Sequence, residues 1–363
     1  MARKLAFDRT LFVTGVGLTL FGLVMIYSAS AVIAVERYGS PHHFLIKQAV
    51  AAVIGLGGMA AAMHYDYRRL LQRPFVYLSL LASILLLVAA LVSDTTHQVH
   101  RWIQAGPIQI QPSEIAKLSL LLFLAYLIPR KEGAINDVPG TIVPCAVIVG
   151  QLAFLVYLQP DLGTAAIYVL LAIVLLFLAG LDWRYLAATA GACVAALGAM
   201  ILQAPYRVRR VLAFLNPDDD PLGAGFQVRQ SILAVASGGI QGTSLGESRQ
   251  KLFFLPEPHT DFIFSVIAEE LGFFGAAAII VAFGVLFWRG MVAAAHAPDR
   301  GGYYLAAGIT CWLTLQAMLN IAVTVGMVPT KGIPLPFLSY GGSSLVVSLA
   351  GLGVLLNISQ HSS

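Results

Sequence analysis

The sequence predicts an all-α integral membrane protein with about ten transmembrane helices, both termini cytoplasmic, and one large extracellular loop between the seventh and eighth helices. Hydrophobic residues make up 58% of the 363 positions and charged residues 11%, whereas a soluble domain carries about 25% charged residues. The apolar residues form segments long enough to cross a bilayer. A single long polar segment interrupts this pattern.

A helix needs about 20 mostly apolar residues to cross the hydrocarbon core of a bilayer. The predicted spans are 11–33, 44–63, 74–93, 113–128, 140–158, 162–180, 185–203, 262–288, 303–326 and 338–358. The fourth has the weakest pattern, because Glu114 and Lys117 lie near its start. The first is too long for the apolar core of a cleavable signal peptide, and no small-residue cleavage site follows it.

The distribution of basic residues predicts the orientation, because lysine and arginine concentrate in short cytoplasmic connections. With the N-terminus inside, eleven basic residues fall in inner segments and five in short outer segments. The other six lie in the long outer loop, about 204–261, which this rule does not count. We therefore expect a single polytopic domain over residues 1–363, with no nucleic-acid-binding module.

Cys145, Cys193 and Cys311 lie in apolar segments without the spacing of metal ligands, so we expect neither a disulfide nor a zinc site. In the long loop, the acidic run 216–221 contains prolines and favours an ordinary turn over a calcium-binding loop. The same loop holds an amphipathic run, 226–237, that could lie on the membrane surface.

The sharpest polar cluster, residues 256–261, leads directly into the eighth span. Asp261 could cap that helix by accepting hydrogen bonds from its free amides, or it could act in catalysis, and the spacing favours neither. Glu269 and Glu270 follow within the span and should face protein or a polar cavity rather than lipid. We expect Glu270 to tie helices together, and Glu269 could do the same or line the cavity.

Other polar residues are predicted on the same outer side. Glu114 and Lys117 are three residues apart and can pair on one helix face, and Asp161 is positioned to cap the sixth span. Arginine forks suit phosphate oxygens, so Arg207 and Arg210 could bind an anion, although anchoring lipid headgroups is the simpler interpretation. These residues together indicate a polar cavity that faces outward.

The segment before the tenth span combines Lys331 with prolines and paired glycines, which break a helix. Irregular backbone at membrane depth is tolerated where it is buried in protein or lines a cavity. Lys331 could meet a carboxylate or a pyrophosphate there, or it could be an interfacial lysine that reaches toward water.

In these segments the sequence resembles the SEDS family (shape, elongation, division and sporulation). The shared motifs are RWI…QPSE at 101–114, QPDLGT at 159–164, YRVRR at 206–210, GFQVRQS at 225–231, LPEPHTDFIF at 255–264, EELGFFG at 269–275 and PLPFLSYGGSS at 334–344. SRQK at 248–251 and TKG at 330–332 resemble division-type members more than elongation-type members. A sporulation-type member is an alternative, and Ser244 stands where the family usually has glycine.

The resemblance implies a peptidoglycan glycosyltransferase that polymerises lipid II at the septum, in the bacterial cytoplasmic membrane. It also implies a complex with a class B penicillin-binding protein, together with other division proteins. Asp261 matches the essential aspartate of the family. The candidate substrate-binding residues are Glu257, His259, Lys331, Arg207, Arg210, Arg101 and Ser343, and the polar residues expected to shape the cavity are Glu114, Lys117, Asp161 and Glu269.

This substrate class suits one catalytic carboxylate. The donor sugar carries an α-linked diphosphate and the product bond is β-1,4, so the acceptor hydroxyl attacks from the opposite face with Asp261 as general base. Diphosphate leaves without a second carboxylic acid, unlike the leaving group of a glycosidase. Arg207, Arg210 and Lys331 are candidates to stabilise its charge. A divalent cation, Mg²⁺ or Mn²⁺, is a further candidate, although no ligand spacing points to it.

Three other functions fit part of the pattern. A lipid II flippase would also have charges and broken helices, but its polar residues should continue through both leaflets. Here they concentrate on the outer side, with Glu269 and Glu270 as exceptions. A scaffold that only activates the transpeptidase would tolerate Asp261→Asn, and an elongation-type polymerase would differ in its place of action.

Overall fold

The computed structural model describes residues 7–93, 100–105, 108–215, 224–252, 255, 257–329 and 332–361. The helices are α1 (Arg9–Tyr38), α2 (His43–His64), α3 (Tyr67–Leu70), α4 (Arg73–Ser93), α5 (Pro112–Arg130), α6 (Val143–Leu158), α7 (Leu162–Leu178), α8 (Trp183–Leu202), α9 (Pro205–Leu215), α10 (Ala224–Gly238), α11 (Ile263–Ala295), α12 (Arg300–Thr324) and α13 (Gly342–Gln360). A 3-10 turn at Glu132–Ala134 and a π-helical turn at Val138–Ile142 precede α6. Strands β1 (Ile103–Ala105) and β2 (Ile108–Ile110) pair in antiparallel register, with Ile103 opposite Ile110.

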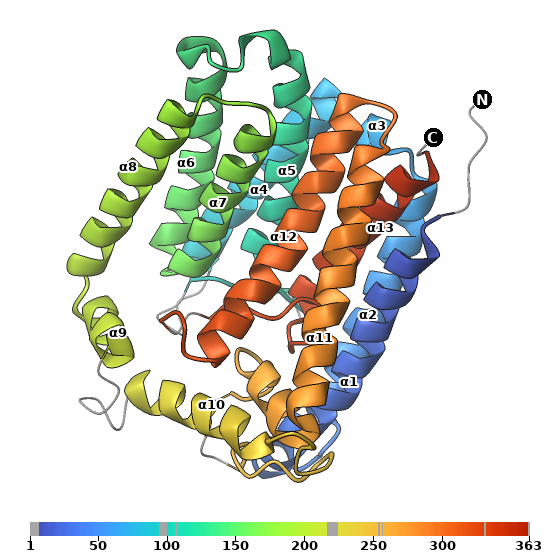
Figure 1. The fold of residues 1–363 in the computed structure, drawn as a ribbon, viewed down its shortest axis with the longest axis vertical. Helices are drawn as coiled ribbons and strands as arrows, with labels where there is room; N and C mark the ends of the chain where they lie inside the picture. Colours follow the sequence, from blue (N-terminus) through green and yellow to red (C-terminus); the bar gives the residue numbers. More distant parts are fainter. Residues whose placement is uncertain are drawn as a thin grey trace.

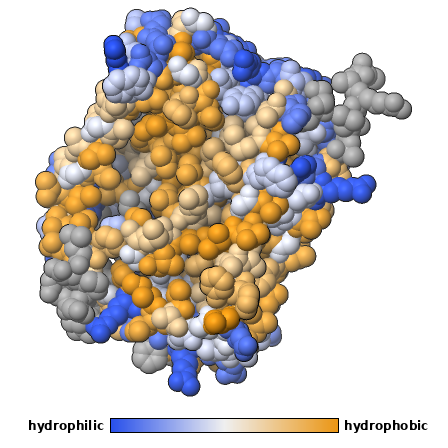
Figure 2. All heavy atoms as spheres, in the orientation of Figure 1, coloured by the Kyte–Doolittle hydropathy of each residue, from blue (hydrophilic) through white to orange (hydrophobic). Residues whose placement is uncertain are grey.

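Each predicted span corresponds to one helix of the structure. Nine helices in the described ranges are long and apolar enough to cross a membrane, and α7 is an apolar helix of 17 residues. Both termini lie at the same end of the bundle, and α9, α10 and the loop before α11 lie at the opposite end (Figure 1). Figure 2 shows hydrophobic residues over the middle of the molecule and hydrophilic residues at both ends. The predicted all-α membrane fold is confirmed, whereas the cellular side of each end stays a prediction.

The centre of the bundle is formed by α5, α12 and α13. Along their most apolar windows 83%, 72% and 67% of the residues are buried, compared with none in α8. Glycines allow close helix contacts, as expected where packing rather than the hydrophobic effect holds helices together. A Cβ on Gly353 of α13 would lie 2.5 Å from the carbonyl oxygen of Met59 in α2.

The eighth span differs from the prediction because α11 is longer and is broken at Gly272. This glycine has φ 65° and ψ −161°, a conformation that side chains with a Cβ rarely adopt. The break leaves the carbonyls of Glu269 and Glu270 free to accept hydrogen bonds from the amides of Thr243 (3.0 Å) and Ser244 (3.1 Å). The long loop is therefore attached to the break in the helix.

We expect Gly272→Ala to lower the free energy of unfolding by about 2–3 kcal/mol. The new Cβ would lie 2.4 Å from the backbone nitrogen of Gly242 and 2.6 Å from the carbonyl oxygen of Ile240. Thermal unfolding of the detergent-purified protein measures the effect. Gly284→Ala is the matched control, because a Cβ there meets nothing within 4 Å. Equal stability of the two variants would contradict this account of the break.

The amphipathic run 226–237 forms most of α10, but it packs against protein rather than lying only on the membrane surface. Ser231 is fully buried. Its hydroxyl lies 2.6 Å from the Ser265 hydroxyl and 2.6 Å from the carbonyl oxygen of Thr324. Helix α10 is thus attached to α11 and α12 through the buried Ser231 hydroxyl.

The tenth span begins as irregular backbone, and helix α13 starts at Gly342 rather than at residue 338. Phe337 has φ 66°, a strained conformation for a bulky residue. Gln48 of α2 holds the end of this segment, donating to the Ser339 carbonyl (3.2 Å) and accepting from the Gly341 amide (3.1 Å). The predicted break in the helix before the tenth span is therefore present, and it is buried in protein.

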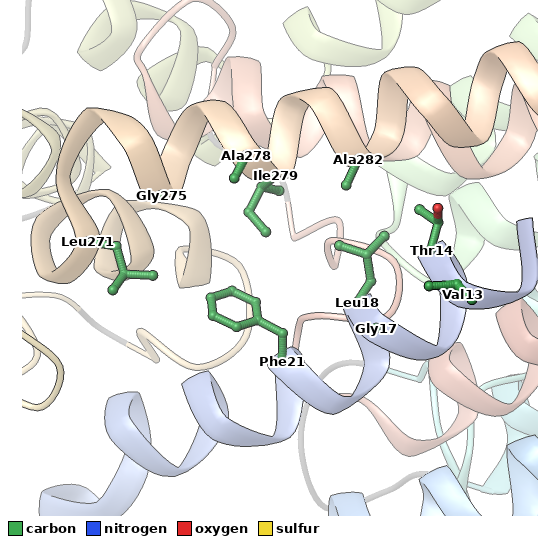
Figure 3. Close-up of a pocket in the computed structure, with 10 residues that line it drawn as sticks. All are labelled: Val13, Thr14, Gly17, Leu18, Phe21, Leu271, Gly275, Ala278, Ile279 and Ala282. Carbon is green, nitrogen blue, oxygen red and sulfur yellow. The ribbon is translucent and has the colours of Figure 1, made fainter. Parts of the chain in front are cut away.

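A crevice of about 340 Å³ lies between α1 and α11 (Figure 3). The residues that line it are Val13, Thr14, Gly17, Leu18, Phe21, Leu271, Gly275, Ala278, Ile279 and Ala282. Thr14 supplies its only polar side chain, and it contains no acid or base. This crevice is therefore a gap in helix packing within the apolar band and not a candidate catalytic site.

Candidate active site

A turn at residues 257–260 brings Asp261 toward the irregular segment before α13. The amide and hydroxyl of Thr260 both donate to the Glu257 carbonyl, at 3.1 and 2.8 Å. The Tyr340 amide donates to the His259 carbonyl (2.8 Å), and the Ser339 hydroxyl donates to the Thr260 carbonyl (2.6 Å). Two segments about 80 residues apart in sequence are thereby fixed against each other.

Asp261 does not cap α11. The N-cap position is Phe262, and no side chain caps that helix end. The backbone of Asp261 is held by Asn320 of α12, whose amide nitrogen donates to the Asp261 carbonyl (2.9 Å) and to the Ile333 carbonyl (2.8 Å). Of the two predicted interpretations, capping is wrong, and the Asp261 side chain remains available for chemistry.

Asp261 as a whole residue is neither fully buried nor fully exposed. Among the described residues, no side chain donates a hydrogen bond to it. The backbone of Gly332 approaches closely, since a Cβ there would lie 3.3 Å from Asp261 Oδ2. The surrounding protein raises the pKa of Asp261 to about 6, chiefly by desolvation. A carboxylate with free lone pairs and a pKa near neutrality suits a general base.

Within the part of the chain that the structure describes, four charged side chains act on Asp261. Arg101 and Arg210 lower its pKa, whereas Asp161 and Glu257 raise it. These residues come from four separate parts of the chain, and all four were predicted from the sequence as site residues. The structure therefore assembles a mixed-charge site around one carboxylate, as the clustering of polar motifs indicated.

Arg101 and Asp161 also have structural partners at the turn between α6 and α7. Arg101 donates to the Gln159 carbonyl (2.9 Å) and to the Pro160 carbonyl. Asp161 caps α7, accepting from the amide (3.1 Å) and hydroxyl (2.9 Å) of Thr164. The predicted cap at Asp161 is confirmed. The cap holds the Asp161 carboxylate in the turn, from where its negative charge raises the pKa of Asp261.

Glu257 is held between two basic groups. One carboxylate oxygen accepts from Arg37 at the end of α1 (3.0 Å), and the other lies 3.5 Å from His259 Nε2. Glu257 is about half exposed, but His259 is buried against the rings of Phe44 (4.4 Å) and Tyr340 (5.4 Å). Burial lowers the pKa of His259 to about 4. His259 is thus a buried, neutral group next to Glu257, and a direct role in substrate binding stays a prediction.

Three more predicted binding residues have different surroundings. The Ser343 hydroxyl donates to the Gln109 carbonyl (2.7 Å) and accepts from the Gln111 amide (3.1 Å), so it attaches the hairpin to α13. Arg207 lies 4.8 Å from the Tyr157 ring centroid and donates to the Met200 carbonyl (2.9 Å). Lys331 and the acidic run 216–221 lie outside the described residues. A direct role in binding stays a prediction for Arg207, Ser343 and Lys331, and Ser343 in addition holds the hairpin in place.

Glu114 and Lys117 form the predicted ion pair, with Nζ to Oε1 at 2.8 Å and each side chain 1% exposed. Lys117 also donates to Gln316 Oε1 (2.7 Å), and Gln316 Nε2 donates to the Pro334 carbonyl (2.9 Å). This pair explains how charges are tolerated inside the fourth span. It also connects α5, through α12, to the irregular segment next to Asp261.

Glu269 and Glu270 are both buried and hold the long loop. Glu269 accepts from the Ser248 hydroxyl and from the Arg249 amide (2.9 Å). Glu270 accepts from Lys251 (2.7 Å) and from the Ser28 hydroxyl (2.7 Å) on α1. As predicted, Glu270 joins α11 to another helix, α1, and it also binds the loop. Of the two roles predicted for Glu269, the structure shows the structural one, because Glu269 binds the loop at residues 248 and 249.

The residues that position the site were not predicted from the sequence; they are Arg37, Gln48, Gln316, Asn320 and Ser339. Gln48, Gln316 and Asn320 are amides inside apolar spans, where an unpaired polar group is costly. That cost could have identified them as residues with specific partners. Arg37 carried no such signal, because basic residues at the ends of spans are common.

The described residues contain no group of three or more histidine, cysteine, aspartate or glutamate side chains that could hold a metal ion. Magnesium sites need few protein ligands when substrate phosphates supply the others. A site completed by substrate phosphates is therefore compatible with these residues, and a divalent cation stays a prediction.

These features define the class of protein: a multi-pass membrane protein with a mixed-charge site at the end of the bundle opposite its termini. A model of the family described as "Cell cycle protein", named for FtsW, RodA and SpoVE, matches residues 8–363. The chain therefore belongs to the FtsW/RodA/SpoVE family, and the predicted resemblance to the SEDS family is confirmed.

Two relatives cover essentially the full length. The chain is 41% identical to "Probable peptidoglycan glycosyltransferase FtsW" of Geobacter sp. (strain M18), and the match covers 99% of each protein. It is also 41% identical to "Stage V sporulation protein E" of Bacillus subtilis (strain 168), again over 99% of each.

Solved structures show the same fold. The RodA protein of Thermus thermophilus superposes with a TM-score of 0.71 and 30% identity, over 98% of this chain and 97% of that one. A chain reported under "Structural coordination of polymerization and crosslinking by a peptidoglycan synthase complex" superposes with a TM-score of 0.80 and 31% identity, over 98% of both chains.

Proposed function

We propose that this protein is a peptidoglycan glycosyltransferase that polymerises lipid II during septal cell-wall synthesis. The observation that carries the proposal is the Asp261 carboxylate, which caps no helix, has a raised pKa and lies among Arg101, Arg210, Asp161 and Glu257. The full-length relatives named as FtsW glycosyltransferases support the reaction class.

In the proposed reaction, Asp261 accepts the proton of the acceptor sugar hydroxyl as that oxygen attacks the anomeric carbon of the donor. The bond from this carbon to the diphosphate breaks at the same time, and inversion converts the α-linkage to a β-linkage. Arg101 and Arg210 already act electrostatically on this position. They, together with Arg207 and Lys331, are proposed to stabilise the departing diphosphate.

The position of the charges favours an enzyme over a flippase. A path for a headgroup through both leaflets would need polar side chains facing a channel along the bundle. The buried charges of α5 and α11 instead have fixed partners: Glu114 pairs with Lys117, Glu270 pairs with Lys251, and Glu269 accepts from the Ser248 hydroxyl and the Arg249 amide. A scaffold would have no need for an Asp261 carboxylate that is left without a hydrogen-bond donor among the described residues.

The proposed setting is the bacterial cytoplasmic membrane, with the active site on the outer face at the division septum. The proposed partner is a class B penicillin-binding protein, which would crosslink the glycan strands. A structural neighbour from a peptidoglycan synthase complex that coordinates polymerisation and crosslinking supports such a pairing.

The test is polymerisation of purified lipid II by the protein in liposomes, with and without the cognate class B penicillin-binding protein. We expect glycan strands, with a higher yield when the partner is present. Failure to form polymer even with the partner, while labelled lipid II crosses the bilayer, would favour the flippase. If no polymer forms and no lipid II crosses the bilayer, but the protein still stimulates the partner to crosslink added glycan strands, the scaffold is favoured.

The pH dependence of polymerisation should report the ionisation of Asp261. The base must be deprotonated, so with a pKa of about 6 we expect half of the maximal rate near pH 6 and about a tenth near pH 5. The negative charge of Glu257 raises this pKa. Glu257→Gln should therefore move the acid limb to lower pH, and an unchanged limb would show that another group controls it.

A further inference from the structure

Two arginines at the end of the bundle that carries the termini form a cluster with tyrosines. The Arg73 guanidinium lies 5.9 Å from the Tyr77 ring centroid, and the Arg130 guanidinium lies 3.7 Å from that of Tyr126. The two rings are 6.0 Å apart and nearly perpendicular. These four residues, the basic–aromatic cluster, join the start of α4 to the end of α5.

Three other arginines at this end are neutralised by carboxylates. Arg68 pairs with Asp299 (3.1 Å), Arg289 with Asp8 (2.5 Å) and Arg300 with Glu132 (3.2 Å). Neither arginine of the basic–aromatic cluster has a carboxylate within 4.0 Å in the part of the chain that the structure describes. The Arg130 guanidinium makes one hydrogen bond, to the Tyr126 carbonyl (2.6 Å). The cluster thus carries two positive charges without a described counterion from the protein.

An open pocket of about 410 Å³ adjoins this cluster and is lined by Arg73, Pro74 and Tyr77. Leu78, Leu81 and Leu85 continue from it along one face of α4 at helical spacing, and they are 65%, 53% and 59% exposed. In a membrane protein such a face contacts acyl chains, and tyrosine is enriched where acyl chains meet headgroups. The pocket therefore lies at the boundary between polar and apolar surroundings.

We propose that the basic–aromatic cluster binds the phosphate of an anionic glycerophospholipid, whose acyl chains lie along the exposed leucines of α4. Guanidinium forks match phosphate oxygens, and the tyrosine rings hold the two guanidinium groups in place. Basic pockets near helix ends on the cytoplasmic side favour anionic headgroups. The site shares no residue with the region around Asp261, and the proposal does not depend on the reaction proposed above.

Native mass spectrometry of the detergent-purified protein tests this site. The protein is titrated with phosphatidylglycerol, cardiolipin or the zwitterionic phosphatidylcholine. We expect the anionic lipids to bind more tightly, and Arg73→Gln/Arg130→Gln to weaken their binding about 30-fold, or about fivefold for each arginine. Arg184→Gln, at the same end but outside the cluster, is the matched control and should leave binding unchanged.

Inorganic phosphate forms the second arm of the experiment. Binding of phosphate as tight as that of the phospholipids would overturn the lipid assignment and identify a soluble-anion site. Equal phospholipid binding by the wild type and the double variant would overturn the site itself. Arg73→Lys/Arg130→Lys keeps both charges and should retain part of the affinity, which separates loss of recognition from loss of folding.

Discussion

Asp261→Asn should reduce lipid II polymerisation by about 10²–10⁴-fold, the usual contribution of a general base. The substitution keeps the shape of the side chain and removes only its ability to accept a proton. Because folding raises the pKa of Asp261 to about 6, the charged form gains no stability from its surroundings. We therefore expect an unchanged or slightly higher unfolding temperature. Glycan yield and thermal unfolding of the same preparation measure the two effects.

Asp161→Asn is the matched control for this experiment. That carboxylate accepts two hydrogen bonds from Thr164 at the start of α7, so its loss should cost about 1 kcal/mol of stability. Polymerisation should fall much less than with Asp261→Asn. Normal polymer yield from a folded Asp261→Asn protein would reject the general-base mechanism and would favour the hypothesis that the protein is a scaffold for the transpeptidase.

The membrane spans could be predicted from the sequence because each is a local property. About 20 consecutive apolar residues suffice to cross a bilayer, and all ten predicted spans are helices. The break inside the eighth span and the late start of the tenth helix were not predicted, because both depend on partners outside the span. The break at Gly272 is stabilised by amides of residues 243 and 244, and the irregular backbone before Gly342 is stabilised by Gln48. Neither partner is visible in the hydropathy of the span itself.

The candidate site was only partly predictable. Its charged members could be found because charges near apolar spans are costly and therefore informative. Their arrangement depends on contacts between distant residues: Arg37 with Glu257, 220 positions apart, and Gln48 with Ser339, 291 positions apart. No periodicity links such pairs. For the same reason, the sequence could not distinguish a capping Asp261 from a free one until the start of α11 was known.

Lys117→Met should destabilise the protein by about 3–5 kcal/mol, the usual result of leaving one member of a buried ion pair without its partner. Lys117 donates to both Glu114 (2.8 Å) and Gln316 (2.7 Å), and it is 1% exposed. Its removal leaves the Glu114 carboxylate buried without a counter-charge. Thermal unfolding in detergent measures the loss. A variant as stable as the wild type would show that water reaches this carboxylate.

The double variant Glu114→Gln/Lys117→Met separates two effects of losing Lys117: the loss of a counter-charge for Glu114 and the loss of the hydrogen bond to Gln316. Replacing both members of a buried pair removes the uncompensated charge, so we expect most of the stability to return. The hydrogen bond from Lys117 to Gln316, however, stays lost, and Gln316 holds the Pro334 carbonyl beside the segment that contacts Asp261. A restored unfolding temperature with polymerisation still reduced about tenfold would identify the pair as positioning residues. Full recovery of both properties would instead limit the pair to stability.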